Sequence, residues 1–404
     1  MRVRTGLAAC GVGTIARERR SGTGATTQIG RSPAVLEHNF TGPAFTIGIE
    51  EELMLLDPES LNLVQGIERS RADVPGDRAD QVKPELLQSV LEIATRPCAD
   101  VGEGARQLGD LRLLVRGIAE ANGMLVGAAG THPFARCTDQ RIVERERYRE
   151  LVEELGFIAT RELIFGTHVH VAIDSPDKAI YVADGIRRYL PLLLALSANS
   201  PYFEGERTNL MSARTPIFRA FPRVGVPPHY GTWEIYSQRV SQMMRAGAIE
   251  DYTYLWWDVR PHPKLGTVET RIFDQATRLD DTAAFAALTQ SLCHRFAALF
   301  EDGEPLTEQP WELIDDNKVR AAVSGMGGML VDFGRGERVR ATDLAHRLLG
   351  ELDEDARELG CSDELRRVEA IIEEGTGATR QLAYLAEHGE DLVELVRAEV
   401  AVTA

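Results

Sequence analysis

The stretch of sequence that decides the fold is FTIGIEEELMLL, residues 45–56. Apolar residues flank three consecutive glutamates and an Asp-Pro turn signal follows, so the stretch predicts a strand that ends at a turn. Side chains two apart on a strand share a face, so Glu50 and Glu52 should point one way and Glu51 the other. Two like charges on one face repel each other, and a divalent cation would offset that cost. A solvated strand face is the alternative for this motif taken alone.

The next acidic pattern lies in residues 84–96, which we expect to form a helix. Pro84 suits a first helical turn and Pro97 would stop the helix. Glu85 and Glu92 are seven residues apart, which is close to two full turns, so both would lie on one polar stripe. A helix face exposed to solvent would show the same stripe, and the pattern leaves both interpretations open.

Two later stretches place histidine, glutamate and arginine on expected strands. GTHVHV contains His168 and His170 on one face among apolar neighbours, which favours contact with a metal ion or a phosphate. VETR contains Glu269 and Arg271 on one face, where the glutamate could hold a metal and the planar guanidinium a phosphate or carboxylate. Carboxylate companions favour Mg²⁺ or Mn²⁺ over zinc. A core histidine and a cross-strand ion pair are the respective alternatives.

The remaining pattern indicates an α+β protein, because strands and helices alternate without a regular βαβ period. We expect helices on one face of the sheet. The further expected strands are 124–129, 165–173, 256–260 and 267–273. The expected helices are 100–122, 139–155, 179–199, 234–249 and 281–301, with mainly helix from about 342 onward, and the expected loop regions are 66–80 and 200–232.

Composition excludes some classes of partner. The chain of 404 residues has 45 Lys and Arg against 62 Asp and Glu, a formal net charge of −17, so it should not bind nucleic acid. No apolar run approaches the roughly 18 residues that span a bilayer, so no membrane partner is expected. Five widely spaced cysteines without a CxxC pair fit a reducing cytosol and a cytoplasmic protein. Residues 1–40 are expected to be a disordered extension or to follow a misplaced start codon, and 41–404 to form a single domain.

Cationic and amide residues in expected loops could supply further contacts to phosphates and carboxylates. Arg214 lies in the loop region, and Asn317 and Arg320 follow a helix. For each of these residues taken alone, a structural role is the simpler explanation. The chain contains no GxxxxGK[ST] loop, no GxSxG elbow, no HExxH and no glycine fingerprint after a strand.

Taken together, these motifs resemble the carboxylate–amine ligases, also called type-2 glutamate–cysteine ligases, of the glutamine synthetase-like superfamily. The resemblance covers roughly residues 45–390 and rests on the order of several motifs. They are GIEEEL (48–53), PELLQSVLEIAT (84–95), GTHVHV (166–171), LSANSP (196–201), WDVRP (257–261) and GTVETR (266–271).

The resemblance implies a curved, mainly antiparallel sheet, as in a glutamine synthetase-like catalytic domain, that holds ATP and two or three Mg²⁺ or Mn²⁺ ions. The implied metal residues are Glu50, Glu52, Glu85, Glu92, His168 and Glu269. Arg271 would bind the transferring phosphate and Arg214 the substrate carboxylate. Asn317 and Arg320 would lie near the nucleotide, and His170 is a weaker candidate beside its motif.

The implied reaction activates a carboxylate with ATP as an acyl phosphate, which an amine then converts to an amide. Glutamate and cysteine are the expected small-molecule pair, and a homodimer is a family-level expectation. One departure is RTNL, residues 207–210, where such proteins are expected to be richer in glycine. Three alternatives stay open: a ligase for another acid or amine, a metal-dependent amide hydrolase, and a non-catalytic ligand-binding relative.

Overall fold

The computed structural model of the protein describes residues 36–403. The extension expected over residues 1–40 therefore falls, up to residue 35, outside the described residues. Leu36 donates its backbone N–H to Ser237 Oγ at 3.1 Å, and Phe40 is buried, so these residues pack against the rest of the fold.

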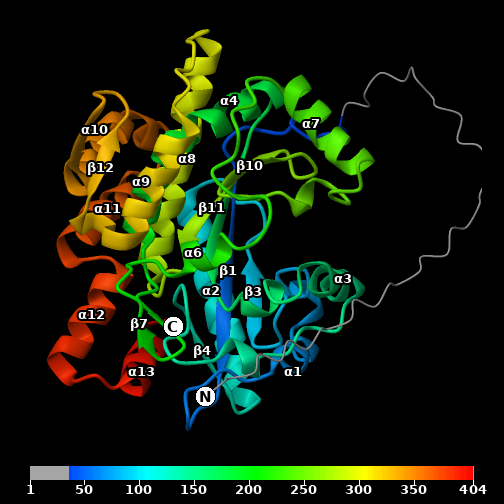
Figure 1. Ribbon diagram of the computed structural model, residues 1–404, viewed down its shortest axis with the longest axis vertical. Helices are drawn as coiled ribbons and strands as arrows, with labels where there is room; N and C mark the ends of the chain where they lie inside the picture. Colours follow the sequence, from blue (N-terminus) through cyan, green and yellow to red (C-terminus); the bar gives the residue numbers. More distant parts are fainter. Residues whose placement is uncertain (1–35, 404) are drawn as a thin grey trace, which may run out of the picture. The chain divides into compact units, whose positions relative to one another are not determined.

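The centre of the fold is a seven-stranded sheet in the order β10-β11-β5-β1-β3-β2, with β4 paired to the end of β1 (Figure 1). Every pairing within it is antiparallel. This confirms the expected α+β class and the mainly antiparallel sheet. The strands are β1 Ile47–Leu56, β2 Val82–Pro84, β3 Val90–Ala94, β4 Leu125–Gly127, β5 Gly166–Ala172, β10 Val259–His262 and β11 Thr267–Asp274.

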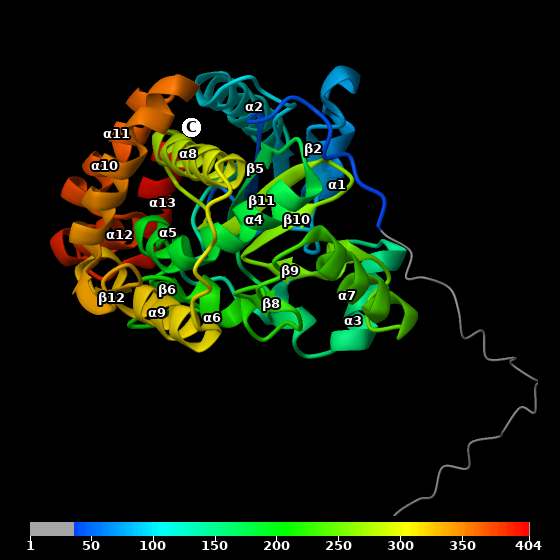
Figure 2. The ribbon, with the colours of Figure 1, turned by 90° about the horizontal axis from the view of Figure 1, so that it is seen from above.

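Strand β1 has a different environment on each of its two faces. On the rear face Ile47, Ile49, Glu51 and Leu53 are all almost completely buried. Helices α2 and α8 cover that face, as Figure 2 shows from above. The opposite face is hollowed into a cavity.

Glu51 is held on the rear face by an ion pair with Arg112 of α2. Arg112 Nε and Nη2 donate to the two carboxylate oxygens at 2.7 and 2.6 Å, and Thr282 of α8 donates its hydroxyl at 2.6 Å. The expectation that Glu51 points away from Glu50 and Glu52 is confirmed.

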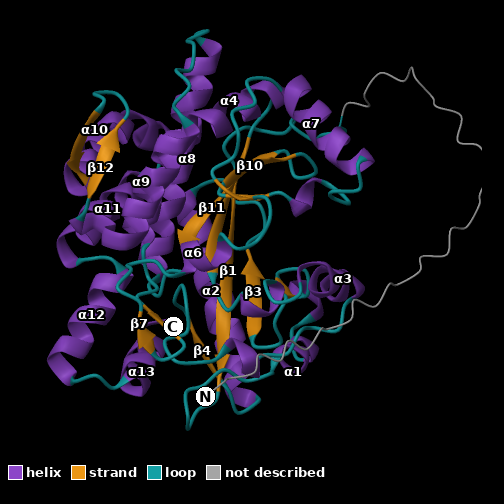
Figure 3. Ribbon diagram, viewed as in Figure 1, coloured by secondary structure: helices purple, strands orange, loops and turns teal. Residues whose placement is uncertain are grey.

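Helices α2, α4, α5 and α8 make the main helical contacts with the sheet, and the C-terminal part from 341 on is helical as expected (Figure 3). The helices are α1 Ile67–Ala72, α2 Val101–Ala121, α3 Glu146–Leu155, α4 Pro176–Ile186, α5 Leu190–Ser197, α6 Arg214–Phe218, α7 Trp233–Arg245, α8 Leu279–Glu301, α9 Trp311–Ser324, α10 Ala341–Leu359, α11 Ser362–Glu374, α12 Gly377–His388 and α13 Leu392–Thr403. Small two-stranded pairs are β6 Tyr202–Phe203 with β7 Glu206–Arg207, β8 Val224–Gly225 with β9 Trp256–Trp257, and β12 Met329–Asp332 with β13 Glu337–Arg340.

The expected helix over 84–96 is wrong. Pro84 ends strand β2, and Val90–Ala94 forms strand β3 with all five residues buried. The stretch is rich in good helix formers, but pairing with β1 on one side and β2 on the other outweighs that local preference. Glu85 and Glu92 therefore do not share a helical stripe, since Glu85 lies in the connection and Glu92 on the strand.

Smaller differences follow from local turn chemistry. The expected loop 66–80 contains the short helix α1 and a 3₁₀ turn. The expected helix 179–199 is two helices separated by a 3₁₀ turn at Arg187–Tyr189, just before Pro191, which cannot donate a helical hydrogen bond. Helix α3 begins at Glu146 rather than 139.

Candidate active site

Four neighbouring strands bring five of the six predicted metal residues onto one face of the sheet, and Glu85 reaches the same cavity from the connection between β2 and β3. In the register of the ladders, Glu52 of β1 is the direct cross-strand partner of Glu92 of β3, and Glu50 that of His168 of β5. Across the next pair of strands, Glu269 of β11 is opposite His170. Directly opposed like charges are destabilising, and Lys83 Nζ, 2.9 Å from Glu92, offsets part of that cost for the Glu52–Glu92 pair.

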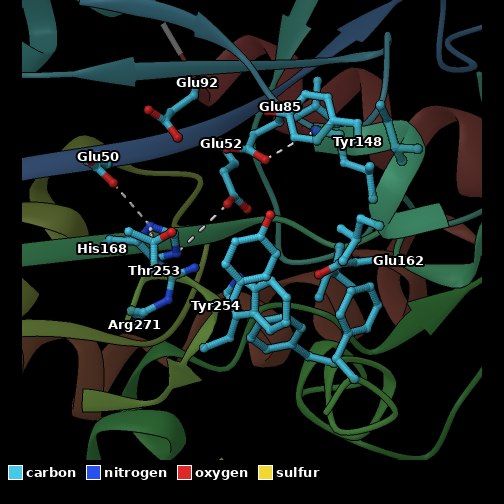
Figure 4. Close-up of a pocket in the computed structure, with 18 of the residues that line it drawn as sticks. Glu50, Glu52, Glu85, Glu92, Tyr148, Glu162, His168, Thr253, Tyr254 and Arg271 are labelled. Atoms are coloured by element: carbon cyan, nitrogen blue, oxygen red, sulfur yellow. Dashed lines mark hydrogen bonds and ion pairs between the residues drawn. The ribbon is translucent and has the colours of Figure 1, made fainter. Parts of the chain in front are cut away.

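A cavity of about 410 Å³ lies on this front face of the sheet (Figure 4). An adjoining hollow of about 580 Å³ shares six lining residues with it. Of the predicted site residues, the inner cavity is lined by Glu50, Glu52, Glu85, Glu92, His168, Arg214 and Arg271. The shared residues are Glu50, Glu85, Glu92, Arg145, Arg147 and Tyr148.

Both histidines face carboxylates. His168 Nδ1 lies 3.4 Å from Glu50 Oε2, and His168 Nε2 lies 3.8 Å from Glu52 Oε1. His170 Nε2 lies 3.8 Å from Glu50 and 4.0 Å from Glu269. Ligand atoms of Glu50, His170 and Glu269 all lie within 4.8 Å of one another, so the structure groups His170, the weaker sequence candidate, with two predicted metal residues.

Glu269 is neutralised by arginines. Arg260 of β10 donates Nε to Glu269 Oε2 at 2.7 Å, and Arg271 Nη1 contacts Glu269 Oε1. These two arginines hold the pKa of Glu269 well below its usual range against the opposing effect of burial. The alternative of a cross-strand ion pair is thus realised between Arg260 and Glu269, and Arg271 still reaches the cavity.

A glycine and a buried aspartate place Arg214. A Cβ on Gly166 would clash with Arg214 Nη2, so glycine at this position lets the guanidinium lie across β5 as it does here. The loop before Arg214 is fixed by Asp274, whose carboxylate accepts hydrogen bonds from the Ser200 and Ser212 hydroxyls at 2.6 and 2.9 Å. Ser200 Oγ in turn accepts the Arg214 N–H at 3.1 Å.

Three carboxyl groups of the cavity have raised pKa values. Burial raises the pKa of Glu52 to about 7, although Arg214 and Arg271 oppose this shift. Burial and then the charge of Glu92 raise the pKa of Glu85 well above its usual range. Burial and the charge of Glu50 also raise the pKa of Glu92, despite Lys83 Nζ at 2.9 Å.

Two histidine atoms give a test of whether a metal fits here. His168 Nε2 and His170 Nε2 are buried and have no hydrogen-bond partner within the described part of the chain. Buried nitrogens that face carboxylates without a partner, together with carboxylates of raised pKa, are the donor set that a hard divalent cation accepts. The residues present therefore fit Mg²⁺ or Mn²⁺.

Two predicted residues lie away from this face. The Asn317 amide exchanges hydrogen bonds with the backbone of Val331 at 2.8 and 3.2 Å, and Arg320 pairs with Asp316 at 2.7 Å. Neither lines the cavity or the adjoining hollow. Asn317 anchors strand β12 to α9.

Several lining residues had no signal in the sequence. Glu162, Arg145, Arg147 and Tyr148 lie on or beside α3 and in the connection to β5, where no strand periodicity marks them. Arg147 donates to Thr253 Oγ1 at 3.1 Å, and Tyr148 donates its hydroxyl to the backbone of Pro84 at 3.2 Å. The segment around α3 therefore bridges both sides of the cavity mouth.

Comparison with solved structures identifies the fold. The chain superposes on a glutamate–cysteine ligase from Francisella tularensis in complex with AMP with a TM-score of 0.65, over 90% of each chain at 13% identity. A bifunctional glutathione synthetase from Pasteurella multocida gives a TM-score of 0.62 at 14% identity, covering 89% of this chain and 53% of that one. The sheet and its helices thus have the fold of a glutamate–cysteine ligase.

Sequence comparison then gives the family. Residues 46–398 match the model of Glutamate-cysteine ligase family 2, and the chain belongs to that family. A "Putative glutamate--cysteine ligase 2-1" of Rubrobacter xylanophilus is 42% identical over 357 residues, 88% of this chain and 94% of that protein. The similarly named protein of Sorangium cellulosum is 40% identical over 85% of this chain and 92% of its own. Membership makes the chain an enzyme of the ligase class and confirms the resemblance stated above.

Proposed function

We propose that this protein is an ATP-dependent carboxylate–amine ligase that joins glutamate to cysteine with Mg²⁺ or Mn²⁺ as its metal. The observation that carries the proposal is the single cavity into which Glu50, Glu52, Glu92 and His168 point beside Arg271 (Figure 4). Metal ions bound there would offset charge on the phosphates and on the carboxylates. The names of the family and of the Francisella relative, which binds AMP, support ATP as the phosphate donor.

The nucleotide side of the site is supported by unpaired arginines in the outer hollow. Arg71, Arg145 and Arg147 line it, and none of the three has a carboxylate within ion-pair distance among the described residues. Arg71 Nε is buried without a hydrogen-bond partner in the same part of the chain. Guanidiniums without a carboxylate partner, next to a carboxylate cluster, fit a polyphosphate, because they bind its oxygens as planar forks. We therefore propose that Arg71, Arg145 and Arg147, rather than Asn317 and Arg320, contact the nucleotide.

The acid side of the site is the inner cavity. Arg214 is buried and aims its guanidinium across β5, with Nε unpartnered in the described structure, so it can orient the substrate carboxylate that attacks the phosphate. Arg271 is positioned to stabilise the transferring phosphate through charge-assisted hydrogen bonds. No side-chain nucleophile is needed, because the protein supplies orientation and charge neutralisation.

The identity of the two substrates rests on the family name. The departure at residues 207–210 bears little on it, since Arg207 is exposed in β7 and none of these residues lines the cavity. A ligase for another acid or amine uses the same geometry and is a direct outcome of the test below.

Two general expectations accompany the proposal. None of the described helices is both long and apolar enough to cross a membrane. The four described cysteines, Cys98, Cys137, Cys293 and Cys361, are buried free thiols, which supports a cytoplasmic location as part of the proposal. A homodimer stays a family-level prediction.

The test incubates the purified protein with ATP, Mg²⁺ and pairs of amino acids, and follows ADP and new amides by mass spectrometry. ADP that forms only with glutamate and cysteine together supports the proposal, and ADP with another pair redirects it to another ligase. Amide cleavage without ATP would show a hydrolase instead. Absence of turnover with every pair would point to the non-catalytic alternative.

A further inference from the structure

One carboxylate of the cavity stands apart from the predicted metal residues. Glu162 precedes β5 and lies on the far side of the pocket from Glu50 and His168 (Figure 4). Within the described residues its side chain has no hydrogen bond and no ion pair. By contrast, Glu50, Glu92 and Glu269 all have cationic or histidine partners.

The cavity that Glu162 lines contains both apolar and cationic side chains. Ile164, Phe218 and Phe221 line the same cavity and pack in one hydrophobic cluster. Burial, with the charge of Glu52 as the second cause, raises the pKa of Glu162 to about 8, and Arg214 opposes that shift. Glu162 is partly buried, and a partly desolvated carboxylate without a partner loses free energy that a cationic ligand group would restore.

We propose that Glu162 binds the ammonium group of the amine substrate and accepts its proton, which makes it a specificity-determining residue of the proposed ligase. This inference rests on the proposed function and names a subsite that its predicted residues leave unassigned. The ammonium would lie on the apolar side of the cavity, opposite the phosphate-facing Arg271. An α-amino acid with a small apolar or thiol side chain fits beside Ile164 and Phe218.

The chemistry requires such a residue. An alkylammonium has no lone pair, so it must lose a proton before it attacks the acyl phosphate. The N–H bond breaks, its electron pair stays on nitrogen, and the proton passes to a Glu162 carboxylate oxygen. The nitrogen lone pair then forms the C–N bond at the acyl carbon. The C–O bond to phosphate breaks, its electron pair leaves with inorganic phosphate, and the phosphate takes up the second proton that nitrogen loses as the amide forms. A positioned base contributes about 10²–10⁴-fold to such a step.

The test compares wild type, Glu162→Gln and Glu154→Gln with two nucleophiles. Glu154 is an exposed carboxylate of α3 that does not line the cavity, so its variant is the matched control. L-Cysteine is the ammonium-bearing probe, and hydroxylamine, which is uncharged at neutral pH, is the neutral probe that yields a coloured hydroxamate with glutamate and ATP. Loss of the charged contact should raise KM for cysteine about tenfold or more and lower the rate of amide formation.

The hydroxamate rate of Glu162→Gln should stay within about twofold of wild type, because the neutral nucleophile needs neither an ion pair nor a base. Equal losses with both nucleophiles would overturn the inference, since Glu162 would then serve the step that both share. An unchanged KM and rate with cysteine would also overturn it. If wild type itself makes no ADP with glutamate and either nucleophile, the glutamate assignment fails rather than the subsite. The comparison is then repeated with the acid and amine that the substrate screen identifies.

Discussion

The buried ion pair behind the site gives a stability prediction that does not depend on function. Arg112 is 3% exposed and Glu51 is fully buried. Besides two bonds to Glu51, the guanidinium donates to the carbonyls of Ala276, Thr277 and Thr403 at 3.0, 2.8 and 3.1 Å. It thus ties β1 to the loop after β11 and to the end of α13.

Replacing Arg112 with methionine should lower the free energy of unfolding by about 3–5 kcal/mol. The apolar side chain of similar length leaves the Glu51 carboxylate buried without its cation, and such losses have that size. Unfolding entropy of about 2.1 cal/mol/K per residue converts this loss into a fall in Tm of roughly 4–6 °C. Circular dichroism melts and urea titrations would measure it.

Arg116→Met is the matched control on the same helix. Arg116 pairs with Glu120 at 2.9 Å, but both side chains are about half exposed (49% and 50%), so its loss should cost no more than about 1 kcal/mol. The double variant Glu51→Gln with Arg112→Met should be more stable than the sum of the single losses predicts, because no unpaired charge remains. If the Arg112→Met and Arg116→Met variants have the same Tm, the rear ion pair does not stabilise the sheet as we argue.

Three further predictions concern the site and the pH dependence of stability. Glu52→Gln and Glu269→Gln should each lower ADP formation about a hundredfold or more while the protein stays folded by circular dichroism, and normal turnover in both would refute the metal assignment. His294 has a raised pKa, mainly through its hydrogen bond with Asp355 at 2.7 Å, so its contribution to stability is complete below about pH 6.5 and disappears as pH rises through the folded pKa. The Tm difference between wild type and His294→Gln should therefore be larger near pH 5.5 than near pH 8.5, and the opposite trend would contradict the ion pair. Burial raises the pKa of Glu399 to about 8, so its ionisation should cost stability between about pH 4.5 and 8. Glu399→Gln should therefore lose less stability than wild type over this range in the same melts, and an equal loss in both would contradict the assignment.

The parts of the fold that could be predicted from sequence are those whose periodicity reflects burial. Burial alternates along Ile47–Glu52 of β1, so this strand and the faces of Glu50, Glu51 and Glu52 follow from the pattern. GTHVHV is buried almost throughout, and its strand is indicated by the alternation of histidine and valine in the sequence instead. The stretch 84–96 could not be predicted in the same way. All five residues of β3 are buried, because the strand lies between β1 and β2, and a strand buried on both faces has no alternation to reveal it.

The site shows the same division. Glu92 was named through the family resemblance, while the helical geometry suggested for it was wrong, and its cross-strand position opposite Glu52 appears only in the structure. Glu162 and Arg147 lie in irregular segments that reach the cavity through tertiary packing, for which a single sequence holds no signal. The sequence could not show which of His168 and His170 is the better metal ligand, because both lie on one face of β5. Only their cross-strand partners, Glu50 for His168 and Glu269 for His170, distinguish them.

Three consecutive glutamates of β1 have opposite effects on the stability of the fold. On the front face, burial raises the pKa of Glu52, so its ionisation costs folding free energy as pH rises toward 7. On the rear face, Glu51 lies in a fully satisfied pair that fixes which residues point forward, because a slip of one position would exchange the two faces. The fold gains nothing from the front charges by themselves, and a hydrophobic face would be more stable. Their presence is therefore explained by what they bind, and the stability of the rear pair is what allows the front face to be assembled before any cation or substrate arrives.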